Sequence, residues 1–189
     1  IEYAGNSAIG NAATLYLKQR FPHMDAVTVQ YSATQGIFGT GLADVFWSGV
    51  QVKSSASNGL NMNVRKFRLR QSLVSDNKRG MYVTSTESFA IPDEWLVVDT
   101  CQFLRNSVSG HGGGAYVAPG YENDDLMTKF RGNTFEGNAA TDRAGGLYYE
   151  PDDYEEGQSL LMQGNTFKEN QSNQGSAMLL RYMYGSLAI

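Results

Sequence analysis

A repeat constrains this chain of 189 residues more than any other feature of its sequence. Three segments follow the pattern Phe-x-x-Asn, then a polar turn, a pair of small residues and a short apolar strand. Their phenylalanines lie 32 residues apart, and so do their asparagines: Phe103, Phe135 and Phe167, and Asn106, Asn138 and Asn170. Such units cannot bury an apolar face alone, so they stack on one another around a continuous core.

The apolar strand of the repeat can be followed through the rest of the chain. Its anchor residues are spaced by 22, 23, 21, 34, 32 and 30 positions, at Leu15, Ile37, Leu60, Met81, Ala115, Leu147 and Ala177. A step of about 20–24 residues is too short for a helical repeat pair and fits one coil of short strands. Segments rich in β-branched and aromatic residues predict further strands at 27–31, 45–52 and 96–103. We therefore predict an all-β chain that forms a single parallel β-helix segment of about seven coils over residues 1–189. We expect this segment to be a fragment of a longer solenoid.

The three longer steps carry insertions after the anchor strand, at 84–94, 118–127 and 150–158, and we place them all at one corner. They contain 11 of the 19 acidic residues and no Lys or Arg. Clustered carboxylates can ligate calcium, and the candidates are Glu122, Asp124, Asp125, Asp152 and Asp153. No calcium-loop motif accompanies them, so we expect a solvated acidic ridge and no bound cofactor.

The repeated asparagines are predicted to be structural. Asparagine tolerates the left-handed backbone conformation of tight corners. Asparagine side chains stacked coil on coil can also hydrogen-bond one another along the axis. We therefore expect Asn106, Asn138 and Asn170 to form a ladder and not a ligand site.

The residue after each anchor should point outward, because side chains alternate along a strand. Five of these seven residues are aromatic, and Asn61 and Met178 are the others; the aromatic ones are Tyr16, Phe38, Tyr82, Tyr116 and Tyr148. A stacked row of exposed rings suits the apolar face of a sugar or the surface of another protein. The alternative is that the rings pack only on one another or beneath a corner loop.

The Phe-x-x-Asn segments, followed by Gly-Gly-Ala-Tyr at 113–116 and Gly-Gly-Leu-Tyr at 145–148, resemble repeats of the polymorphic outer-membrane proteins of chlamydiae. This match covers about residues 96–180. More broadly, the segments are similar to the right-handed parallel β-helix repeats of the pectin-lyase-like superfamily, and this similarity implies a right-handed solenoid. The first resemblance implies adhesion or surface display. The second also allows polysaccharide lyases and hydrolases.

An enzymatic function depends on two candidate residues. Ser-Gly-His-Gly at 109–112 resembles an element of polygalacturonases, which would make His111 catalytic with Asp99 as its carboxylate. Glycoside hydrolysis needs two carboxylates, and no aspartate pair occurs near His111 in the sequence. We therefore predict a protein without catalytic activity; the alternative is a polysaccharide-active lyase or hydrolase, or a degenerate relative of one.

Charge and composition limit the kinds of partner that the chain is expected to bind. A net charge of −4 argues against a nucleic-acid backbone as the main partner. No apolar run approaches the ~18 residues that a membrane-spanning helix needs, and the single cysteine, Cys101, excludes an internal disulfide and a thiolate zinc site. We predict an extracellular or cell-surface structural or adhesive module that contacts other protein chains, further coils of its own chain, or a glycan.

Overall fold

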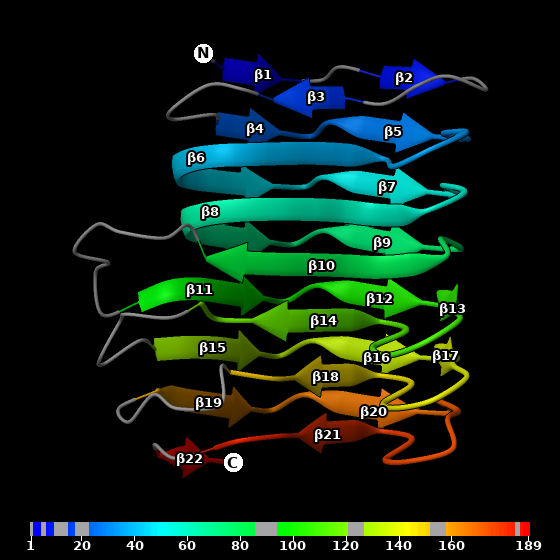
Figure 1. The fold of residues 1–189 in the computed structure, drawn as a ribbon. Helices are drawn as coiled ribbons and strands as arrows, with labels where there is room; N and C mark the ends of the chain where they lie inside the picture. Colours follow the sequence, from blue (N-terminus) through cyan, green and yellow to red (C-terminus); the bar gives the residue numbers. More distant parts are fainter. Residues whose placement is uncertain are drawn as a thin grey trace.

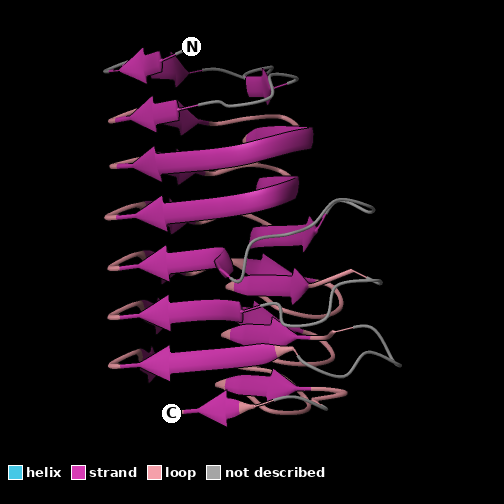
Figure 2. Ribbon diagram, turned by 90° about the vertical axis from the view of Figure 1, so that its left-hand side faces the viewer, coloured by secondary structure: helices cyan, strands magenta, loops and turns pink. Residues whose placement is uncertain are grey.

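The computed structural model describes residues 2–4, 7–9, 15–17, 23–85, 94–120, 127–151, 158–183 and 186–189. These residues form strands and turns and no helix, and their paired strands run parallel. The strands stack as successive rungs, with the N-terminus and C-terminus at opposite ends of the stack (Figures 1 and 2). The prediction of an all-β, parallel, solenoid-like architecture is therefore confirmed.

Each coil contributes strands to three faces. The first face contains β3 (Leu15–Leu17), the first parts of β6 (Ile37–Ser48) and β8 (Asn58–Arg70), β10 (Arg79–Ser85), β14 (Ala115–Ala118), β18 (Leu147–Tyr149) and β21 (Met178–Leu180). The second face contains β1 (Glu2–Ala4), β4 (His23–Asp25), the last parts of β6 and β8, β11 (Glu94–Asp99), β15 (Met127–Arg131), β19 (Ser159–Gln163) and β22 (Leu187–Ala188). β6 and β8 bend around the corner between these faces without a break (Figure 1).

The third face is a separate sheet of short strands. It contains β2 (Ser7–Ile9), β5 (Thr28–Gln30), β7 (Gln51–Lys53), β9 (Leu73–Ser75), β12 (Gln102–Leu104), β16 (Thr134–Glu136) and β20 (Thr166–Lys168). Two further strands pair at the corner that leads back to the first face, β13 (Ser107–Val108) and β17 (Ala139–Ala140).

The core consists of apolar columns that run along the axis, one residue from each coil. The first-face column contains Leu15, Ile37, Leu60, Met81, Ala115, Leu147 and Met178. The last anchor is therefore Met178 and not the predicted Ala177, which is exposed. The other two columns contain Met24, Trp47, Leu69, Val98, Phe130 and Met162, and Val29, Val52, Val74, Phe103, Phe135 and Phe167.

The corners between faces use left-handed backbone conformations. After the second face the residues with positive φ are Ala26, Gly49, Gln71, Thr100, Gly132 and Gly164. Two predictions are corrected here, because Gly49 and Thr100 divide the strands predicted at 45–52 and 96–103 into two strands each. After the third face the residues with positive φ are Tyr31, Ser54, Asp76, Arg105, Gly137 and Glu169.

The three acidic insertions fall between first-face and second-face strands, from β10 to β11, β14 to β15 and β18 to β19. The calcium candidates Glu122, Asp124, Asp125, Asp152 and Asp153 lie outside the described residues. Within the described ranges, no three His, Cys, Asp or Glu side chains come together as metal ligands. The same ranges contain no helix that is long and apolar enough to cross a membrane.

Candidate functional site

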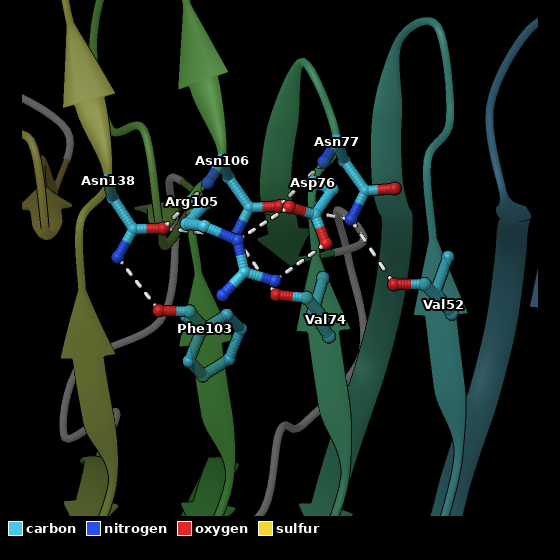
Figure 3. Close-up of polar contacts among 8 residues, drawn as sticks. All are labelled: Val52, Val74, Asp76, Asn77, Phe103, Arg105, Asn106 and Asn138. Atoms are coloured by element: carbon cyan, nitrogen blue, oxygen red, sulfur yellow. Dashed lines mark hydrogen bonds and ion pairs between the residues drawn. The ribbon is translucent and has the colours of Figure 1, made fainter.

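The asparagine ladder follows the third face (Figure 3). Asn77 and Asn106 each donate from the backbone N–H and from Nδ2 to Oδ1 of the next asparagine, at 3.0–3.1 Å. Asn138 donates in the same way to Asn170, at 3.0 Å. Each Nδ2 also donates to a carbonyl of the preceding coil; for Asn138 this is the Phe103 carbonyl, at 2.8 Å. The ladder therefore joins the coils through their side chains as well as their strands.

Two details of this ladder differ from the sequence analysis. The left-handed residue at each corner directly precedes the asparagine, as Arg105 precedes Asn106, so the asparagines are needed for their hydrogen bonds and not for positive φ. Asn77 belongs to the ladder although its coil has Val74 at the phenylalanine position. The pattern that finds all four members is an apolar residue followed three positions later by asparagine.

A second, shorter ladder follows the second face and was not predicted. Asn133 donates from its backbone N–H and Nδ2 to Oδ1 of Asn165, at 3.0 and 2.9 Å. Oδ1 of Asn133 accepts from the backbone N–H of Cys101 at 2.9 Å. The sequence signal is the Asn-Thr-Phe at 133–135 and 165–167, in which the asparagine comes directly after a left-handed glycine.

Cys101, whose backbone N–H donates to the second ladder, belongs to the core and is only 1% exposed. Burial raises the pKa of its thiol to about 12, so the thiolate needed for nucleophilic or metal-binding chemistry is scarce at neutral pH. We predict that 5,5′-dithiobis(2-nitrobenzoic acid) labels Cys101 only after denaturation. Rapid, stoichiometric labelling of the native protein would contradict this assignment.

The predicted aromatic row lies on the outer side of the first face. Tyr16 and Phe38 stack at 5.1 Å between ring centroids, Tyr82 and Tyr116 at 5.1 Å, and Tyr116 and Tyr148 at 5.2 Å. Asn61 occupies the position between Phe38 and Tyr82 and so interrupts the row of rings. The position after Tyr148 is occupied by Leu179, and not by Met178 as predicted.

Exposure differs along the row. Tyr16 is 48% exposed and the rings of Phe38, Tyr82 and Tyr116 are partly exposed, but Tyr148 is 0% exposed. The prediction that Tyr148 belongs to an exposed face is therefore wrong. Its ring lies 4.9 Å from that of His111, and its hydroxyl accepts from Arg143 at 3.3 Å. Side chains of the neighbouring corner thus cover a ring that strand alternation does direct away from the core.

Charged groups are part of the row. The Arg79 guanidinium lies 5.5 and 5.6 Å from the ring centroids of Tyr82 and Tyr116, and its Nε donates to the His111 carbonyl at 3.1 Å. Glu150 accepts from the Tyr116 hydroxyl and from Arg181, both at 2.7 Å.

These contacts determine how the polar groups ionise. Burial and the Glu150 carboxylate both raise the pKa of Tyr116. Burial raises the pKa of Glu150, but hydrogen bonds from Tyr116 and Tyr148 and the charge of Arg181 outweigh it, so its net pKa is lowered. Tyr116 is therefore neutral and Glu150 ionised at pH 7, and the row presents rings edged by paired charges.

The structure does not bring the two catalytic candidates together. Asp99 ends β11 on the second face, where Oδ2 lies 3.9 Å from Nε of Arg70. His111 lies at the corner between the third and first faces, with Nδ1 3.3 Å from Asp142 and a bridge to Arg143. Each candidate is engaged in a local contact on a different side of the coil.

Comparison with known proteins identifies no relative of this chain. No family model, no curated protein sequence and no solved structure matches the chain.

Proposed function

We propose that the chain is a non-catalytic structural or adhesive module of a large secreted or cell-surface protein, outside the cell. We further propose a right-handed β-helix of about seven coils, of the pectin-lyase-like kind. The parallel arrangement supports this handedness, because connections between parallel strands of one sheet are almost always right-handed. The self-pairing asparagine ladders support a scaffolding role, since they use polar side chains to join coils and not to bind a ligand.

The aromatic row is the observation that carries the proposal. Tyr16, Phe38, Tyr82 and Tyr116 present partly exposed rings on one face, and Arg79 stacks beside two of them. Tyrosine and arginine are enriched at protein interfaces because they bury a large area while keeping a polar end. We propose that this row contacts another protein chain or a glycan.

The double variant Tyr16→Ser and Tyr82→Ser tests this function. We expect it to fold, since both side chains are at least partly exposed, and to weaken association about tenfold or more. The measurements are sedimentation velocity for self-association and a glycan array for sugar binding. Tyr31→Ser is the matched control, because Tyr31 is 57% exposed at the corner after the third face, away from the row.

Two outcomes would count against the proposed function. One is association that is equal in the wild type and the double variant. The other is association that Tyr31→Ser weakens as much as the double variant does, because the row would then have no particular role.

Tyr148→Ser is expected to act on stability instead. The ring is fully buried between Tyr116, His111 and Arg143, so its removal leaves a cavity and should lower the free energy of unfolding by about 3 kcal/mol. Tyr82→Ser should cost less than half as much, because its ring is already partly in water. Urea unfolding of both variants measures the difference, and equal losses would show that Tyr148 is accessible in solution.

A further inference from the structure

A groove of about 420 Å³ lies on the outer side of the second face, and its lining includes His23, Phe46, Arg68, Arg70, Asp99 and Thr100. These residues come from β4, β6, β8, β11 and the corner after β11. Strand pairing puts His23, Phe46 and Arg68 in one outward column. It puts Arg70 and Asp99 in the next outward column. The groove is therefore built by register, from side chains that alternate with the buried core column.

The apolar wall of the groove is Phe46, which is 39% exposed. The Arg68 guanidinium lies 5.5 Å from the centroid of this ring, close enough for a cation–π contact. Arg68 donates from one terminal nitrogen to Glu94 at 3.1 Å, but its buried Nε has no hydrogen-bond partner. The guanidinium lines the groove and has donors beyond the terminal nitrogen that Glu94 occupies, so an oxyanion in the groove can accept a hydrogen bond from it.

The second cation of the groove is Arg70. Its side chain is 56% exposed, and its Nε lies 3.9 Å from Asp99, which is longer than a hydrogen bond. Asp99 therefore balances the charge of Arg70, while the exposed side chain of Arg70 lines the groove and is accessible from it. Arg68 and Arg70 are two positions apart on β8, so their side chains leave the same side of the strand about 6–7 Å apart.

We propose that this groove binds a ligand that carries a single oxyanion, a carboxylate or a phosphate monoester, on a planar apolar body. The oxyanion accepts hydrogen bonds from Arg68 and Arg70, whose planar guanidinium groups suit such anions. The apolar body packs on Phe46. Asp99 repels additional negative charge, which favours a single anion over a polyanion.

The test is a titration of the isotopically labelled protein with four probes, in which NMR chemical shifts report binding. Phenyl phosphate and benzoate should both shift the signals of Phe46, Arg68 and Arg70 in a saturable way. Inorganic phosphate, which lacks the apolar body, should bind about tenfold more weakly, and benzyl alcohol, which lacks the charge, should not bind. Saturation by only one of the two aromatic anions also supports the proposal and identifies the oxyanion.

Variants separate the two parts of the groove. Arg70→Gln should weaken the binding of both aromatic anions about tenfold or more. Phe46→Ser should lower the affinity for phenyl phosphate to that for inorganic phosphate. Arg105→Gln is the matched control, because Arg105 is similarly exposed and is paired with Asp76 on another face. The proposal is overturned if the aromatic anions do not saturate, or if Arg70→Gln and Arg105→Gln bind alike.

Discussion

Replacing Asn138 with alanine is expected to lower the free energy of unfolding by about 2–4 kcal/mol. The side chain is fully buried, and its Oδ1 accepts from both the backbone N–H and Nδ2 of Asn106. Its own Nδ2 donates to the Phe103 carbonyl and to Oδ1 of Asn170. Alanine leaves the buried Asn106 N–H without this acceptor, and a buried polar group that loses its partner costs about 1–3 kcal/mol. The lost bonds to the coils on both sides add to this cost.

Urea unfolding followed by circular dichroism measures this loss as a shift of the midpoint. Asn173→Ala is the control, because Asn173 is an exposed turn residue and its replacement should change stability by less than about 0.5 kcal/mol. A midpoint for Asn138→Ala that equals that of the wild type would mean that water replaces the ladder without cost. The column would then be a consequence of the fold and would not contribute to its stability.

The ladder could be predicted from sequence because the 32-residue repeat keeps the same residue at the same place in successive coils. The left-handed corners after the second and third faces could not be predicted in detail. Arg105, Thr100 and Gln71 all adopt positive φ although none of them is glycine or asparagine. The hydrogen bonds of the following residue and of the stacked strands hold these corners in place, so the identity of the corner residue itself carries little signal.

The outer surface was harder to predict than the core. Alternation along the strand correctly gives the register of Tyr148 with Tyr116, but it does not show that His111 and Arg143 cover the Tyr148 ring. The groove on the second face was missed for a related reason. Its residues come from β4, β6, β8 and β11, most of which precede the regular repeat, so the sequence alone does not fix their relative register.

Replacing Phe135 with alanine is the change expected to have the largest effect, a loss of about 3–5 kcal/mol of unfolding free energy. Phe135 is fully buried and lies between two parallel rings, with centroids 4.8 Å from Phe103 and 4.9 Å from Phe167. Its removal opens a cavity in the middle of a close-packed column. The third face is made of short strands, so the column supplies much of the contact between its neighbouring coils.

The same substitution along the column provides an internal comparison. Phe167 is only partly buried and stacks on one described ring, so Phe167→Ala should cost clearly less than Phe135→Ala. Phe46→Ala removes a 39% exposed ring outside the core and should cost about 1 kcal/mol or less. Urea unfolding of the three variants should therefore rank Phe135 above Phe167 and Phe167 above Phe46. If Phe135→Ala lost no more than Phe46→Ala, the third-face column would not be the packed core that its stacking geometry indicates, and coil-to-coil stability would depend on the asparagine ladders and strand hydrogen bonds instead.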